Sequence, residues 1–252
     1  MDENKIKRIN ELYHKSKAEG LADAEKKEQQ LLRQEYIASV RENLRGQLNN
    51  ISIQEKDGSV TDLGKKYGRK KEIRKRILGL REEMDCLNWR EKTAAIFHKV
   101  TAHPWFQEAN TIYCYVDFRN EVGTADLMEK AWEMGKSVAV PKTDGERMDF
   151  YYIRSLQETA PGNFGVREPD PRKCRMADGK EGLLILPGSA FDVKGYRIGY
   201  GKGYYDRYLQ LHPELLPMAV AFDFQVLEEI PHEAHDRRAQ VIVTDKRMIE
   251  NR

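Results

Sequence analysis

The residues best suited to chemistry lie in one ten-residue segment, Arg197–Asp206, which reads Arg-Ile-Gly-Tyr-Gly-Lys-Gly-Tyr-Tyr-Asp. Its glycines stand at alternate positions, so the backbone can adopt positive φ angles and no Cβ blocks a ligand. Successive N–H groups in such a loop can bind an anion. Arg197 and Lys202 add positive charge, and the Asp206 carboxylate suits Mg²⁺. These features suit a metal–nucleotide polyphosphate, although a glycine-rich turn with solvated charges is the equal alternative and the spacing is not that of Walker A.

The stretches on either side predict the elements that hold this segment. Before it, Gly182–Leu186 is a short apolar run closed by Pro187 and Gly188, which is typical of a buried strand ending in a turn. After it, Tyr204–His212 carries aromatic and apolar residues at helical spacing and stops before Pro213. We therefore expect the segment to lead to a helix N-terminus on the carboxyl side of a sheet, where open α/β folds bind anionic ligands.

Four motifs follow one another along the second part of the chain. They read Lys70-Lys-Glu-Ile-Arg74, Asn120-Glu-Val-Gly-Thr124, Phe164-Gly-Val-Arg-Glu-Pro169 and Leu186-Pro-Gly-Ser-Ala-Phe-Asp-Val-Lys-Gly-Tyr-Arg-Ile-Gly-Tyr-Gly-Lys-Gly-Tyr-Tyr-Asp206. From about Lys70 to the C-terminus the chain thus resembles the 5-formyltetrahydrofolate cyclo-ligase family, also called methenyltetrahydrofolate synthetases. The resemblance implies a ligase that uses ATP and Mg²⁺ to cyclise 5-formyltetrahydrofolate to 5,10-methenyltetrahydrofolate, releasing ADP and phosphate.

The same resemblance implies a role for each matching residue. Catalytic roles fall on Arg197, Lys202 and Tyr204. ATP-binding roles fall on Lys70, Arg74, Arg197, Ile198, Gly199, Tyr200, Gly201, Lys202, Gly203, Tyr204 and Tyr205. Substrate-binding roles fall on Val116, Glu121 and Tyr204. The metal role falls on Asp206, with Gln240 or Asp236 as the second ligand. Without the family, Lys70 and Arg74 would read as an exposed basic helix, Glu121 as a solvated loop residue, and Val116 and Tyr204 as packing residues.

Two positions depart from the family pattern. Gly123 stands where the family has Asp, which is expected to alter only the cap of the next helix, with Thr124 as its N-cap. Gln240 stands where the family has a second metal-binding Asp, and a neutral amide coordinates Mg²⁺ more weakly than a carboxylate does. The spacing of His232 and His235 does not fit a His-Glu-x-x-His zinc site.

From Tyr67 onward the residue pattern alternates between helices and strands. Helices are expected over Lys70–Met84, Asn88–Thr101 and Thr124–Met134. Strands are expected over Thr111–Val116, Ser137–Val140, Met148–Ile153, Leu183–Leu186, Met218–Phe222 and Val241–Thr244. This order predicts a mainly parallel sheet with helices on both faces. The family resemblance implies a three-layer α/β/α fold of the NagB/RpiA/CoA-transferase-like kind over residues 65–252.

Residues 1–64 have a different character. Helical spacing over Lys5–Glu19 and Asp23–Leu48, with Gly20 between them, predicts an antiparallel helical hairpin, and Val60–Lys66 is expected to be a linker. Arg8-Ile-Asn-Glu-Leu12 and Leu32-Arg-Gln-Glu-Tyr36 resemble the YnzC-type family of helical hairpins, which implies a fold but no biochemical role. Ala22 replaces that family's capping Thr, so either Asp23 caps the helix or its start is frayed. Because two helices bury little apolar area, we expect self-association or packing on the second domain.

Composition sets the remaining expectations. Of 252 residues, 40% are hydrophobic and 33% charged, with a net charge of +2, which gives no electrostatic case for nucleic acid or a membrane. Three scattered cysteines and a polar Met-Asp-Glu-Asn-Lys start predict a cytoplasmic protein without a signal peptide. Two alternatives stay open. One is an ATP-binding protein of the same fold with another N-formyl or carboxyl substrate, and the other is a non-catalytic folate- and ATP-binding protein whose hairpin binds a partner.

Overall fold

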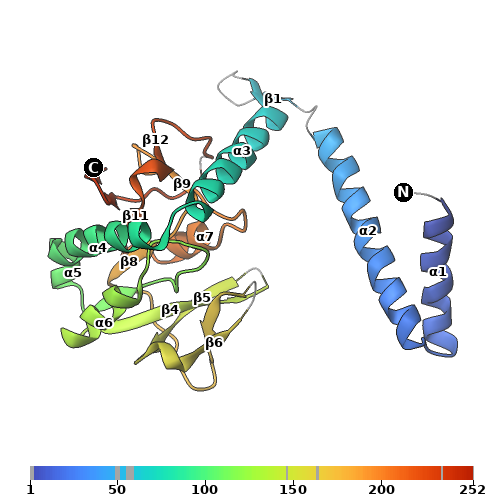
Figure 1. Cartoon of the computed structure of the whole chain (residues 1–252), viewed down its shortest axis with the longest axis horizontal. Coiled ribbons are helices and arrows are strands. Elements are labelled where there is room, and N and C mark those ends of the chain that lie inside the picture. Colours follow the sequence, from blue (N-terminus) through green and yellow to red (C-terminus); the bar gives the residue numbers. More distant parts are fainter. Residues whose placement is uncertain are drawn as a thin grey trace. The chain divides into compact units, whose positions relative to one another are not determined.

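The computed structural model describes residues 3–48, 52–54, 60–145, 147–162, 165–233 and 235–251. It divides the chain into two compact units, residues 1–68 and 69–252 (Figure 1). Helix α3 (Leu63–Glu82) runs through the boundary between them. Each unit is therefore described by itself.

The first unit is built on the helical hairpin that the sequence predicts. Helices α1 (Glu3–Ala18) and α2 (Asp23–Leu48) are joined at Gly20, whose φ of 82° reverses the chain. The two helices are antiparallel, as shown by ion pairs whose positions run in opposite directions along them, namely Lys5–Glu35 at 2.6 Å, Arg8–Glu28 at 2.9 Å and Lys15–Glu25 at 2.7 Å.

The start of α2 is capped by a residue that the sequence analysis did not consider. The Glu25 carboxylate accepts the Ala22 N–H at 3.0 Å, which is the backward half of a capping box. Asp23 does not take over the cap, because its carboxylate is paired instead with Lys26 at 3.0 Å. The helix start is thus stabilised from its third residue.

The expected linker is wrong. Strand β1 (Ser52–Gln54) pairs antiparallel with β2 (Val60–Asp62), and α3 begins directly afterwards at Leu63. Local composition missed this pairing because β2 is short and depends on a partner strand that lies earlier in the chain.

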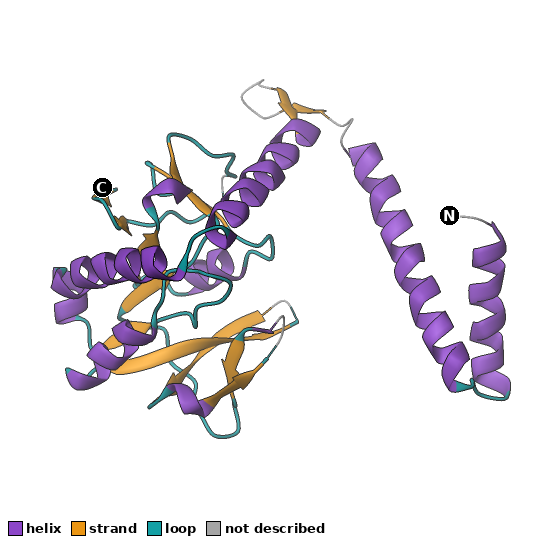
Figure 2. Cartoon of the chain, viewed as in Figure 1, coloured by secondary structure: helices purple, strands orange, loops and turns teal. Residues whose placement is uncertain are grey.

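The second unit contains a seven-stranded sheet in the order β14-β13-β11-β8-β3-β4-β5. The strands are β3 (Thr111–Tyr113), β4 (Ser137–Asp144), β5 (Arg147–Ile153), β8 (Leu183–Leu186), β11 (Leu216–Ala221), β13 (Val241–Thr244) and β14 (Met248–Glu250). The five central strands are parallel, and the edge strands β5 and β14 are antiparallel (Figure 2). The direction in which strands are added reverses between β3 and β8, so the loops that leave these two strands face each other.

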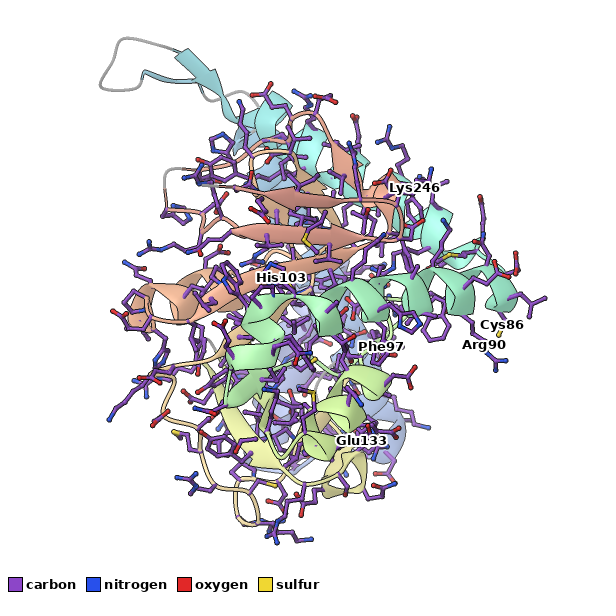
Figure 3. The ribbon with its side chains drawn as sticks, turned by 90° about the vertical axis from the view of Figure 1, so that its left-hand side faces the viewer. Cys86, Arg90, Phe97, His103, Glu133 and Lys246 are labelled. Carbon is purple, nitrogen blue, oxygen red and sulfur yellow. The ribbon has the colours of Figure 1, made fainter. Side chains whose placement is uncertain are left out.

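Helices cover both faces of this sheet, because its central strands are apolar on both sides. In β8, Leu183 and Ile185 pack into the core beneath α4 (Cys86–Ala102), α5 (Pro104–Glu108) and α6 (Ala125–Glu133). Leu184 and Leu186 point to the opposite face and pack with α7 (Tyr204–Leu211). Figure 3 shows α4 crossing its face of the sheet, with His103 just beyond one end and Cys86 at the other. The predicted three-layer α/β/α architecture is confirmed.

Several smaller elements lie outside the seven-stranded sheet, and the sequence analysis did not predict them. Strands β9 (Ala190–Asp192), β10 (Arg197–Ile198) and β12 (Val226–Leu227) form a separate sheet, and β6 (Thr159–Pro161) pairs with β7 (Arg167–Pro169). Single 3₁₀ turns span Leu156–Glu158 and Asp223–Gln225. The strand expected over Thr111–Val116 ends earlier, at Tyr113, because the chain then leaves the sheet toward the site. In the part of the chain that the structure describes, no helix has the length and apolarity to span a membrane.

Candidate active site

Within the second unit, one face of α3 carries three cations and an isoleucine that contact other parts of the same unit. Lys70, Arg74, Ile77 and Arg81 lie within about 60° around the helix axis, because each residue advances about 100°. Ile77 is fully buried and packs with Ala190, Ile198 and Ile230. This apolar contact seats the helix, and each cation reaches a different loop.

Arg74 fixes the glycine-rich loop. Its Nε and Nη2 atoms donate to the Gly199 carbonyl oxygen at 3.0 and 2.8 Å. Further along, Gly201 (φ 91°) and Gly203 (φ 64°) adopt left-handed conformations that are unfavourable for residues with a side chain. Gly203 is also the N-cap of α7. Burial lowers the pKa of Arg74, although a guanidinium remains charged near neutral pH. The loop thus has a fixed start and a helix N-terminus at its end, as an anion site requires.

Arg197 supplies a buried positive charge beside this loop. It lies on β10, and its Nη2 atom forms an ion pair with Asp206 Oδ1 at 2.9 Å. In the part of the chain that the structure describes, Nε of Arg197 has no hydrogen-bond partner, and Nη2 has the Asp206 carboxylate at ion-pair distance without hydrogen-bond geometry. Buried N–H groups rarely lack acceptors, so this pattern points to an oxyanion ligand. Lys202 is exposed on the same loop and forms no ion pair with any described residue.

The carboxylates of Asp206 and Asp236 both lie at the segment around Arg237. Asp206, in the first turn of α7, accepts the Arg237 N–H at 3.1 Å. Asp236 directly precedes Arg237 in the chain. Its carboxylate accepts the Glu233 N–H at 2.8 Å, and its Oδ2 atom lies 3.8 Å from Lys70 Nζ. Lys70 also pairs with Glu233 at 3.4 Å. Asp206 and Asp236 are therefore both next to predicted phosphate-binding cations.

Gln240 lies elsewhere. It precedes β13, its N–H donates to Pro217 O at 2.9 Å, and it lines a surface hollow with His103 and Trp105. This is the edge formed by the amino ends of the parallel strands, whereas the site loops leave the carboxyl ends. The structure thus does not bring Gln240 to Asp206.

The side chains available as metal ligands limit the kind of metal site that this chain can form. Over the described ranges, no group of three or more His, Cys, Asp or Glu side chains could hold a metal ion. Mg²⁺ is commonly held by one or two carboxylates together with substrate phosphates. Asp206, with Asp236 nearby, fits that kind of site and does not form an all-protein cage.

Glu121 forms the other half of the site. Its side chain is buried, Oε2 accepts the Phe118 N–H at 3.1 Å, and Oε1 accepts the Tyr200 hydroxyl at 3.0 Å. Burial raises the pKa of Glu121 above its usual value, and the nearby Arg81 charge opposes that rise. Tyr200 belongs to the glycine-rich loop, so this hydrogen bond joins the two predicted half-sites directly.

The Gly123 departure has a structural explanation. A Cβ at Gly123 would lie 3.0 Å from two ring atoms of Trp89 and 3.1 Å from Thr93 Cγ2. The Trp89 indole N–H donates to the Glu121 carbonyl at 2.8 Å. Trp89 therefore takes the space that a side chain would need and helps hold Glu121. Thr124 is the N-cap residue of α6, but its hydroxyl bonds to Tyr115 O and not to the helix.

The other predicted residues are placed as follows. Val116 is buried in the core beside the Glu121 loop, and the Tyr204 hydroxyl donates to Gly145 O at 2.8 Å in the β4–β5 turn. Tyr205 lies under the Arg197 guanidinium, 5.5 Å from the ring centre. In the third motif, Phe164 lies outside the described residues. The next residue, Gly165 (φ 80°), lies beside the Phe118 ring.

Sequence reasoning missed Arg81. It lies seven residues beyond Arg74, which is two helical turns along the same face, so helical spacing could have identified it. It also missed Arg237 and Gly145, whose backbone contacts carry no signal in their side chains.

Comparison with known proteins identifies two families in the chain. The model of the 5-formyltetrahydrofolate cyclo-ligase family matches residues 66–245. A second model, described as bacterial protein of unknown function (DUF896), matches residues 4–63. Both resemblances drawn from the sequence motifs are confirmed.

Individual relatives agree with these matches. A 5-formyltetrahydrofolate cyclo-ligase of Mus musculus is 29% identical over 198 residues, covering 73% of this chain and 96% of that protein. The solved structure of Aquifex aeolicus 5,10-methenyltetrahydrofolate synthetase has a TM-score of 0.65 at 30% identity, covering 73% of this chain and 93% of that one. A UPF0291 protein of Lachnospira eligens is 56% identical over 68 residues, covering 27% of this chain and 81% of that protein.

Proposed function

The chain belongs to the 5-formyltetrahydrofolate cyclo-ligase family, and on this premise we propose that it converts 5-formyltetrahydrofolate to 5,10-methenyltetrahydrofolate with consumption of ATP. The observation that carries the proposal is the hydrogen bond from Tyr200 to Glu121. It joins an anion-binding loop to a buried carboxylate at the reversal of strand order, so two ligands of the expected kinds would meet there.

The nucleotide half of the site is assigned to the loop and to the cations around it. The backbone N–H groups of residues 199–203 and the side chains of Lys70, Arg74, Arg197 and Lys202 would neutralise the polyphosphate. Arg197 is the strongest candidate to contact the transferred phosphoryl group, because its buried Nε–H group lacks an acceptor among the described residues. Asp206, with Asp236 as the second candidate, would hold Mg²⁺, which supplies charge neutralisation for phosphoryl transfer when bound.

The folate half of the site is assigned to Glu121, Val116 and Tyr204. The Glu121 carboxylate is an acceptor that suits the N–H donors of a pterin, and Val116 contributes an apolar wall. The Tyr204 ring lies at the first turn of α7, between the loop and the β4–β5 turn. The site thereby holds a reduced pterin next to the phosphate-binding groups.

The proposed reaction proceeds in two steps. The formyl oxygen attacks the γ-phosphorus of ATP and ADP leaves, which converts a poor leaving group into phosphate. N10 then attacks the activated formyl carbon and gives up its proton, the carbon–oxygen bond breaks and phosphate departs. The protein contributes positioning and charge neutralisation, which dominate such transfers.

We further propose two domains, residues 1–64 and 65–252, in a cytoplasmic protein. The two family matches, over residues 4–63 and 66–245, support this division. For the hairpin, self-association or packing on the second domain stays a prediction.

The test is turnover of 5-formyltetrahydrofolate with Mg-ATP, followed by near-ultraviolet absorbance of the methenyl product. We expect formation of product to need all three components and to be abolished in Asp206→Ala. Asp126→Ala, an exposed carboxylate on α6, is the matched control and should retain full activity. Product formation without ATP, or undiminished in Asp206→Ala, would contradict the assignment.

A further inference from the structure

Arg81 is the most deeply buried cation among the described residues of the second unit. It stands near the end of α3, and its side chain is 1% exposed. In the part of the chain that the structure describes, it pairs with no carboxylate and instead donates from Nε and Nη2 to three consecutive carbonyl oxygens, those of Phe118, Arg119 and Asn120. Its Nη1 atom has no hydrogen-bond partner among the described residues. Burying a guanidinium is costly unless its donors are satisfied, so the three carbonyls that satisfy Nε and Nη2 are required to stay in place.

The turn that Arg81 holds has an unfavourable backbone. Arg119 (φ 49°) and Asn120 (φ 52°) are consecutive non-glycine residues in the left-handed region. Such conformations persist where surrounding contacts over-determine them. The Asn120 side chain returns a hydrogen bond to the Arg81 carbonyl at 3.1 Å, which fixes the turn and the helix end to each other.

Glu121 follows this turn directly and is held by it. Its N–H donates to Phe118 O at 3.2 Å, and its carboxylate accepts the Phe118 N–H. The Arg81 charge acts on both Glu121 and Tyr200, since it counteracts the effect of burial on the pKa of each. The buried cation thus lies beneath the junction of the two half-sites.

We propose that Arg81 is a positioning residue that shapes the 118–121 turn and so aims Glu121 at the pterin. It acts from the same helix face that fixes the glycine-rich loop through Arg74, so α3 sets the spacing between the folate and nucleotide half-sites. The proposal rests on the proposed function, because it takes Glu121 to be the pterin acceptor.

The test compares Arg81→Lys, which keeps the charge but loses the forked donor, with Arg81→Met, which loses both. Arg76→Met, an exposed arginine on α3, is the matched control. We expect KM for 5-formyltetrahydrofolate to rise about ten-fold in Arg81→Lys and more in Arg81→Met, while KM for ATP stays within about two-fold. Trypsin cleavage after the exposed Arg119 should become faster in both variants and stay unchanged in the control.

A properly folded Arg81→Lys enzyme with an unchanged folate KM would overturn the proposal, and so would equal increases in both KM values. Should neither Arg81 variant fold, Asn120→Ala removes the returning hydrogen bond and should raise the folate KM alone. An unchanged folate KM in that variant would also overturn the proposal. A wild-type chain that neither binds nor converts 5-formyltetrahydrofolate would refute the proposed function itself, while cleavage after Arg119 would still report whether Arg81 holds the turn.

Discussion

The two units of this chain use charge in opposite ways. In the hairpin, ion pairs such as Arg8–Glu28 lie in water, and among the side chains described there Leu12 is the one buried apolar residue. In the cyclo-ligase unit, Arg81, Arg197 and Glu121 are buried, and Arg81 and Glu121 are hydrogen-bonded to backbone. Solvent screens exposed pairs, so they contribute little, whereas a buried charge is costly unless its surroundings are built for it. Among the described side chains, buried charge is therefore confined to the second unit.

The hairpin also keeps apolar side chains in contact with solvent. The large exposed ones among its described side chains are Ile6, Tyr13, Leu31, Tyr36, Ile37 and Val40. A two-helix unit with so little buried apolar area depends on further contacts for stability, which is the basis for predicting self-association or packing on the second domain.

The largest difference between the units is expected when one arginine is removed from each. Arg197→Met should lower kcat/KM about a thousand-fold, because a buried donor to the transferred phosphoryl group is lost. Arg8→Met removes an exposed hairpin cation and should leave kcat/KM within two-fold of wild type. Steady-state kinetics on both variants decide this. A comparable loss in Arg8→Met would end the distinction between the units.

The next effect is the pH dependence of folate binding. The pKa of Glu121 is raised by burial, so as the pH falls this carboxylate takes up a proton earlier than an ordinary Glu, whose pKa is 4.5. The protonated form loses acceptor capacity, so KM for 5-formyltetrahydrofolate should rise by up to about ten-fold per pH unit below the raised pKa. Glu121→Gln should have a high KM at every pH and no such slope. Kinetics at constant ionic strength measure the profile, and an equal slope in Glu121→Gln would assign the titration to another group.

A smaller effect separates two glycines by their backbone. Gly203→Ala forces a side chain into a left-handed conformation 3.1 Å from Arg207 Nη1, and it should destabilise the unit by about 1 kcal/mol and raise KM for ATP. Gly79→Ala lies in open space within α3 and should stabilise the helix by up to about 1 kcal/mol without changing kinetics. Thermal unfolding and ATP kinetics together test this, and the idea fails if the two variants behave alike.

The smallest kinetic effect is expected from deleting residues 1–64. All the contacts that define the site join residues 69–251, so kcat/KM should stay within about three-fold of the full chain. Analytical ultracentrifugation of both forms reports whether the hairpin mediates self-association. A large loss of turnover in a folded truncated protein would show that the hairpin takes part in catalysis.

The sequence by itself determined the elements around the main loop and predicted the chemistry of that loop. The apolar run of β8 predicted a buried strand ending in a turn, and the alternating glycines of Arg197–Asp206 predicted an anion-binding turn before a helix. Helical spacing identified α1 and α2 as a hairpin. These features are local, because each depends on the periodicity or backbone freedom of a few successive residues.

The tertiary structure alone decided which loops meet. No local sequence pattern indicates that Arg81 donates to the carbonyls of residues 118–120. Nor does any indicate that the Tyr200 hydroxyl bonds to Glu121. The sequence also left open whether Asp236 or Gln240 is the second metal ligand. The structure places Asp236 beside Lys70 and Gln240 at the amino ends of the parallel strands. These pairings follow from the reversal of strand order between β3 and β8, which brings together segments far apart in the sequence, and that order is set by packing of the whole sheet.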